Sequence, residues 1–170
     1  EKGTAKRKLS SLTVEQLISP LEHGFSMKLQ NAGIHYENAI NAEDKAFEVQ
    51  VDVTSVDQIL TNLIDNAVKY GQSQKDDSCV QLSCRVSAKY VHLRVSDNGV
   101  GIVKNGRSRL FKEFHKSDVE AAHTKPGVGL GLALSRQLAR ACGGDLRFVD
   151  CAEQPTGACF ELWLPRVGTS

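Results

Sequence analysis

The chain has 170 residues, and its 21 lysines and arginines almost balance its 20 aspartates and glutamates. This length fits one domain with a sizeable core, because single domains cluster near ~100–150 residues. The balanced charge excludes the global field that holds nucleic acid or an anionic membrane, so any charge chemistry is local.

The five cysteines form no C-x-x-C pair and have no histidine at ligand spacing. This pattern argues against a zinc site or a disulfide framework and favours reduced cysteines in the cytoplasm. No apolar run reaches the ~20 residues that cross a bilayer, and no signal peptide is recognisable. We expect a cytoplasmic domain, and this leaves open a parent protein that is anchored in the inner membrane.

The N-terminal third predicts one helix and two strands. Residues 1–11 are polar and basic, which indicates a linker or the end of a preceding helix. Thr13 and Gln16 have the spacing of a capping box, and apolar residues recur at helical intervals after them, so we expect a helix from Thr13 to about Gly33. Residues 34–40 and 47–53 predict short strands.

The rest of the chain alternates between strands and helices. A second helix is expected after Thr54 and Ser55, ending at Gly71. Residues 80–86 and 91–95 alternate as in a hairpin, and residues 130–142 predict a third helix, followed by strands at 146–149 and 159–164. This order predicts a two-layer α/β sandwich with a mainly antiparallel sheet and about three helices on one face. We assign the domain to residues 12–166 and a tail to 167–170.

A polar stripe marks the second predicted helix. Asn62, Asp65, Asn66 and Lys69 share one face at offsets of three, four and seven residues. Such a face can bind a hydrated cation and a phosphate, since Mg²⁺ prefers oxygen ligands and keeps several waters. Taken alone, the stripe is better explained by an ordinary solvated helix face.

Two glycine-rich segments are the other candidates for chemistry. The segment 97–101, Asp-Asn-Gly-Val-Gly, follows a predicted strand, where a carboxylate can accept a hydrogen bond from an amine and glycines let a flat base approach. It is also an ordinary turn sequence. The segment 127–132 opens the third helix, where exposed amides can bind phosphate. Tight helix packing would explain these glycines too.

Four segments, taken together and in this order, resemble the N, G1, F and G2 boxes of histidine-kinase catalytic domains. They read QILTNLIDNAVKY (58–70), DNGVGI (97–102), RLFKEFHKSD (109–118) and PGVGLGLAL (126–134). CGGDL (142–146) and GACFELWLP (157–165) are similar to the end of that family's last helix and its last strand. The resemblance spans residues 12 to 165 and implies the Bergerat fold of the GHKL superfamily, with a flexible ATP lid at 103–126.

The resemblance also implies ATP and Mg²⁺ as ligands. Asn66 would hold Mg²⁺ with support from Asn62, Lys69 would contact phosphate, and Tyr70 would line the nucleotide site. The adenine pocket would be formed by Asp97, which reads the amino group, with Gly99, Gly101 and Ile102. The triphosphate would lie against the start of the third helix, at Gly127, Val128, Gly129, Leu130, Gly131 and Leu132.

Two features depart from the family pattern. The lid carries His115 and Lys116 where a tyrosine and an arginine are common, so Lys116 would meet the γ-phosphate as a point charge without a guanidinium fork. His23 falls within the first predicted helix, too near the N box to be the phosphoacceptor. The other histidines, His35, His92 and His123, we interpret as surface or packed residues rather than catalysts.

The resemblance implies transfer of the γ-phosphate to a histidine on a separate helical domain, and then to a response regulator receiver domain. Hydrolysing members of the superfamily carry a glutamate base at the position of Asn62, so hydrolysis is disfavoured. A serine kinase of the anti-sigma-factor type and a nucleotide-binding module without catalysis stay open as alternatives.

Overall fold

The computed structural model describes residues 7–73, 76–102, 104–112, 130–150 and 156–168. Its centre is a five-stranded sheet in the order β2-β4-β5-β7-β6. The strands are β2 (His35–Asn38), β4 (Cys79–Val86), β5 (Tyr90–Asp97), β6 (Asp145–Phe148) and β7 (Cys159–Pro165). β2 runs parallel to β4 and the other neighbours are antiparallel, so the sheet is mixed and mainly antiparallel, as predicted.

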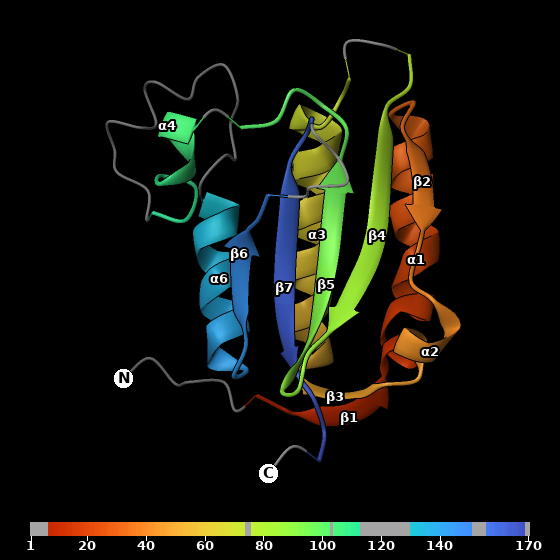
Figure 1. Ribbon diagram of the computed structural model, residues 1–170, viewed down its shortest axis with the longest axis vertical. Coiled ribbons are helices and arrows are strands. Elements are labelled where there is room, and N and C mark those ends of the chain that lie inside the picture. Colours follow the sequence, from red (N-terminus) through yellow and green to blue (C-terminus); the bar gives the residue numbers. More distant parts are fainter. Residues whose placement is uncertain (1–6, 74–75, 103, 113–129, 151–155, 169–170) are drawn as a thin grey trace.

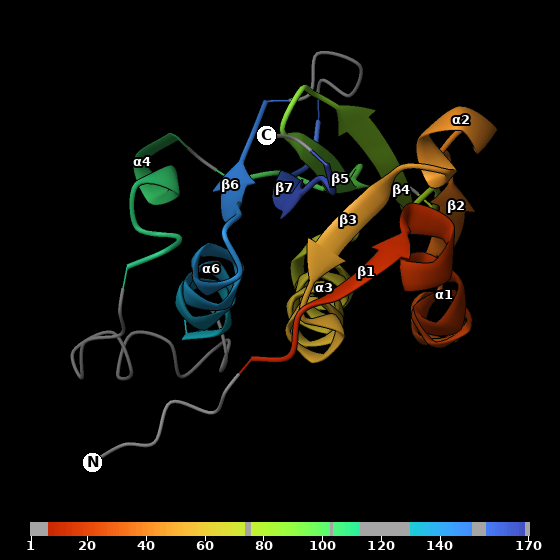
Figure 2. The same cartoon turned by 90° about the horizontal axis from the view of Figure 1, so that it is seen from below.

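Three helices form the second layer. They are α1 (Val14–Asn31), α3 (Val53–Tyr70) and α6 (Leu130–Ala141), and they lie in a row on one face of the sheet (Figures 1 and 2). Two helices of a single turn, α2 (Ala42–Lys45) and α4 (Lys104–Arg107), lie outside this row. The two-layer α/β sandwich predicted from the sequence is therefore confirmed.

The core lies between the two layers because apolar residues alternate along the central strands. Leu93 of β5 is paired with Leu162 of β7, and both side chains are fully buried. The neighbouring positions on each strand point to the opposite face of the sheet, which no long helix among the described residues covers. The helical side of the core is made of fully buried side chains that include Leu17, Leu29, Ile59, Leu60 and Leu63.

The N-terminal capping box is confirmed, but the strand before it was not predicted. The Gln16 N–H donates to Thr13 Oγ1 at 3.1 Å, and the Thr13 N–H donates to Gln16 Oε1 at 3.0 Å. β1 (Ser10–Thr13) pairs with β3 (Glu48–Val51) in a small antiparallel sheet that crosses the lower end of the sandwich in Figure 1. Ordered structure thus begins before residue 12, inside the segment that the sequence assigned to a linker. In the predicted tail, the Val167 N–H donates to the Glu48 carbonyl at 3.0 Å.

The start of α3 corrects the sequence interpretation. The helix begins at Val53, not after Ser55, because Asp52 is the N-cap and its Oδ1 accepts from the Ser55 N–H at 3.3 Å. The helix ends before Gly71, as predicted. Gly71 has an ordinary φ of −88°, so its role is not a left-handed cap. A Cβ there would lie 2.7 Å from the Ala67 carbonyl oxygen and 2.9 Å from Asp97 Cγ.

Candidate functional site

A cavity of about 410 Å³ lies between α3 and the ends of β5 and β7. Its walls are mostly apolar, with a few polar groups, which is the usual make-up of a small-molecule site. The residues that line it are Leu63, Asn66, Ala67, Tyr70, Val95, Asp97, Val100, Gly101, Ile102, Gly106, Leu110, Leu132, Ala158 and Phe160. The cavity therefore brings together residues from the predicted N, G1, F and G2 boxes.

Asp97 is the buried acid of this cavity. It is the last residue of β5 and only 9% exposed. Its Oδ1 accepts hydrogen bonds from the Gly99 N–H at 3.0 Å and the Ala158 N–H at 3.2 Å. Burial raises the pKa of Asp97, and these two bonds only partly oppose that rise. Because both bonds reach Oδ1, Oδ2 receives neither and can accept from a ligand amine.

Glycines pack closely around Asp97. A Cβ on Gly99 would lie 2.7 Å from the carbonyl oxygen of Gly71. Gly157 has a φ of +97°, and a Cβ there would collide with the Asp97 carbonyl. From the sequence, Gly71 is expected only as a helix cap and Gly157 only as part of a strand motif, so neither is predicted as a neighbour of the acid. Both glycines come close to Asp97 only because segments that are distant in the sequence pack together, and no local sequence pattern predicts this.

Asn66 and Tyr70 face the same cavity from successive turns of α3. Burial raises the pKa of Tyr70 above its ordinary value. Among the described residues, no group of three or more His, Cys, Asp or Glu side chains could hold a metal. The Asn66 amide oxygen nevertheless fits Mg²⁺, because this ion keeps several waters and takes its other ligands from substrate phosphates.

Asn62 lines a second groove instead, of about 460 Å³, between α3 and α6. Its Nδ2 donates to Ser135 Oγ of α6 at 3.2 Å. A Cβ on Gly131 would meet the Asn62 amide, so this glycine allows α6 to approach α3. The groove is lined by Thr54, Asp57, Gln58, Thr61, Asn62, Asp65, Gly131, Leu134 and Ser135. The two predicted asparagines therefore lie on neighbouring but different hollows.

The other predicted residues divide into three groups. Lys69 is exposed and lines neither hollow, while Asp65 pairs with Lys28 of α1 at 2.7 Å. Leu132 lines the cavity, and Leu130 is the first residue of α6. Lys116, Gly127, Val128 and Gly129 lie outside the described residues, as does most of the predicted lid.

Leu110 and Phe111, which belong to the predicted lid segment 103–126, lie within the described residues. Leu110 lines the cavity, and both residues pack against the hydrophobic core. The Phe111 ring meets Phe160 of β7 edge-on, with centroids 6.3 Å apart. The start of this segment is therefore fixed to the wall of the cavity.

Comparisons with known proteins agree with this geometry. The family model described as "Histidine kinase-, DNA gyrase B-, and HSP90-like ATPase" matches residues 51–168. Sensor protein KdpD of Escherichia coli is 28% identical over 166 residues, which cover 98% of this chain and 17% of KdpD. Sensor protein CiaH of Streptococcus pneumoniae is 31% identical over 132 residues, 78% of this chain and 28% of CiaH. The chain thus spans less than a third of either relative.

The catalytic domain of histidine kinase ThkA has the same fold. It superposes with a TM-score of 0.74 at 19% sequence identity, covering 94% of this chain and 98% of that domain. Of the helices that the structure describes, none combines the length and apolar character of a membrane span. The fold, the cavity and the family match together lead to one conclusion: the chain belongs to the histidine kinase-, DNA gyrase B- and HSP90-like ATPase family, as a sensor histidine kinase ATP-binding domain.

Proposed function

We propose that this domain binds Mg²⁺-ATP and transfers the γ-phosphate to a histidine on a helical phosphoacceptor domain of the same parent chain or dimer. A response regulator receiver domain would then take the phosphate. The observation that carries the proposal is the placement of Asp97 and Asn66 on one apolar cavity. In this proposal the adenine lies against the apolar walls, and its amino group donates to Asp97.

The phosphate end of the nucleotide belongs beside α3 and the start of α6. Asn66 offers its amide oxygen to Mg²⁺, and this ion would supply neutralisation of phosphate charge. The N-terminus of α6 adds backbone N–H groups, and Gly131 lets this end of α6 lie close to α3. We assign Lys69, Lys116 and residues 127–129 to phosphate contacts on the strength of the sequence resemblance.

Asn62 favours transfer over hydrolysis. An amide is a poor base for activating water, and here its Nδ2 already donates to Ser135 on α6. Phosphoryl transfer depends mainly on positioning and electrostatics, which a domain without a general base can provide. The amide at position 62 distinguishes a kinase from an ATPase, and the acceptor residue, histidine or serine, distinguishes a histidine kinase from a serine kinase.

The test uses γ-labelled ATP with the domain alone and with its helical acceptor domain. We expect slow release of phosphate from the domain alone, and acid-labile, base-stable label on the acceptor. Fast release without acceptor would favour the ATPase, and acid-stable label would favour the serine kinase. ATP binding with no transfer to any acceptor would reduce the domain to a nucleotide-binding module.

A further inference from the structure

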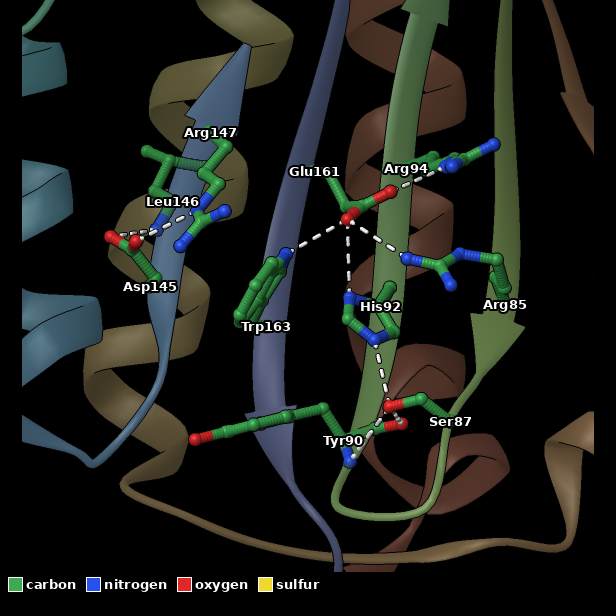
Figure 3. Close-up of polar contacts among 10 residues, drawn as sticks. All are labelled: Arg85, Ser87, Tyr90, His92, Arg94, Asp145, Leu146, Arg147, Glu161 and Trp163. Atoms are coloured by element: carbon green, nitrogen blue, oxygen red, sulfur yellow. Dashed lines mark hydrogen bonds and ion pairs between the residues drawn. The ribbon is translucent and has the colours of Figure 1, made fainter. Parts of the chain in front are cut away.

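The sheet face opposite the helices carries an unusual charge network. Glu161 of β7 points to this face, yet its side chain is only 3% exposed. Figure 3 shows the groups that surround it. Arg94 Nε lies 2.7 Å from Oε2, and Trp163 Nε1 donates to Oε1 at 2.8 Å. Arg85 Nη2 at 3.6 Å and His92 Nδ1 at 3.1 Å also approach Oε1.

A second buried acid lies beside the first, on β6. Asp145 accepts from Arg147 Nε at 3.0 Å, and Arg136 and Arg140 of α6 also reach it through their Nε atoms. The Arg147 guanidinium lies 4.0 Å above the centre of the Trp163 ring, which joins the two networks. Burial opposes ionisation of both acids, but their arginine bonds hold the pKa of each below its usual value.

We call Arg85, Arg94, Arg147 and Trp163 the arginine platform. Around the two acids positive charge exceeds negative charge, because three arginines, two of them from α6, converge on Asp145 and two from the sheet converge on Glu161. The side chains of Arg85 and Arg147 are 53% and 50% exposed. The bond that holds Arg147 to Asp145 uses Nε, so the half-exposed guanidinium keeps Nη donors for a further acceptor. Guanidiniums already fixed in place lose little entropy on binding, and Arg and Trp are typical interface anchors.

We propose that the arginine platform is a docking surface for an acidic protein segment. Carboxylates match the planar forks of Arg85 and Arg147. A nucleic acid fits less well, because Arg147 covers one face of the Trp163 ring and His92 meets it at an 80° angle, leaving little room for a base to stack. The platform lies on the face opposite the helices, so docking is compatible with an occupied nucleotide cavity.

The proposal is tested with fluorescent poly-L-glutamate at low salt, followed by anisotropy. Replacing Arg85→Gln and Arg147→Gln together should weaken binding roughly tenfold and leave ATP affinity unchanged. The matched control replaces Arg7→Gln and Lys8→Gln, which removes the same charge from exposed residues before β1. Equal weakening in both double variants, or no binding by the unmodified domain, would overturn the proposal.

Two further measurements guard against trivial outcomes. The pair Arg85→Lys and Arg147→Lys keeps the charges that compensate Glu161 and Asp145, so it should fold and bind with intermediate affinity. Binding equal to that of the unmodified domain would show that guanidinium forks are not used. Poly-adenylate RNA and vesicles of anionic phospholipid serve as competing ligands. Tighter, platform-dependent binding of either would replace the acidic-protein assignment.

Discussion

The buried position of Asp97 suits ligand binding but lowers the stability of the fold when the carboxyl is ionised. Burial raises its pKa above the ordinary value, so its ionised form opposes folding at neutral pH. Stability that is present when the group is protonated is lost as pH rises through that raised pKa. A buried acid with a raised pKa that lines an apolar cavity is typical of a functional site.

The change Asp97→Asn should therefore separate binding from stability. An amide keeps an oxygen for the Gly99 and Ala158 N–H groups but presents its own donor to adenine. We expect Mg²⁺-ATP affinity to fall roughly 10–100-fold, the value of one charge-assisted bond, with no loss of thermal stability. Calorimetry and thermal unfolding check this against Glu43→Gln on the surface of α2. Unchanged ATP affinity would refute the adenine assignment.

His92 makes the stability of the domain depend on pH. It is 3% exposed, its Nε2 lies 3.0 Å from Ser87 Oγ, and burial lowers its pKa. The unfolded chain binds a proton near pH 6.5, whereas the folded chain binds it only at lower pH. Stability from neutral His92 is thus complete above about pH 6.5 and is lost as pH falls toward the folded pKa.

We expect His92→Gln to flatten this part of the pH profile of unfolding. Urea unfolding between about pH 7.5 and 5 measures it, because the free energy of unfolding should fall less with acid in the variant than in the parent. His23→Gln, at an exposed position on α1, is the control and should keep the parent slope. Parallel profiles for His92→Gln and the parent would contradict the linkage.

At the level of single elements, the capping box of α1 links a sequence motif directly to stability. Thr13 satisfies the Gln16 N–H, and Gln16 returns a bond to the Thr13 N–H. The change Thr13→Ala should lower the free energy of unfolding by about 1 kcal/mol, the typical value of an N-cap. Ser19→Ala on the exposed side of the same helix should cost clearly less. If Thr13→Ala lowers the free energy of unfolding no more than Ser19→Ala does, the capping box does not stabilise the helix.

The fit between α3 and α6 depends on Gly131 and Ser135. Gly131 leaves room for the Asn62 amide, and Ser135, 2% exposed, accepts its hydrogen bond. The change Ser135→Ala leaves that amide without its partner inside the interface. We expect a loss of about 1 kcal/mol in unfolding experiments, within the usual range for a single hydrogen bond. Ser108→Ala, at an exposed position after α4, should be close to neutral.

On the scale of the whole molecule, the proposed reaction depends on a second domain. A linked helical acceptor domain raises the effective concentration of its histidine to the millimolar range for a short linker. We expect phosphorylation of the linked acceptor to be much faster than that of the same acceptor added separately at micromolar concentration. Time courses of labelled acceptor compare the two. Equal rates would show that docking, and not tethering, limits the reaction.

Most of the long helices and strands, and the family, can be predicted from the sequence alone, whereas β1 and the start of α3 were not. Alternation fixed the β4–β5 hairpin, and the spacing of Thr13 and Gln16 fixed the start of α1, because both depend only on neighbours in the chain. The same holds for Asp97, whose place at a strand end followed from the pattern before it. The order of the four boxes predicts the fold and the binding of a nucleotide, which no single motif could establish.

Which residues contact one another depends on tertiary packing. Asn62 and Asn66 are one helical turn apart, yet the packing of α6 places them on different hollows. Gly157 became a neighbour of Asp97 only through pairing of β5 with β7. The burial of Glu161 beneath arginines from β4 and β5 depends on strand order in the same way. Contacts between distant segments arise from packing, which the pattern along one segment does not encode.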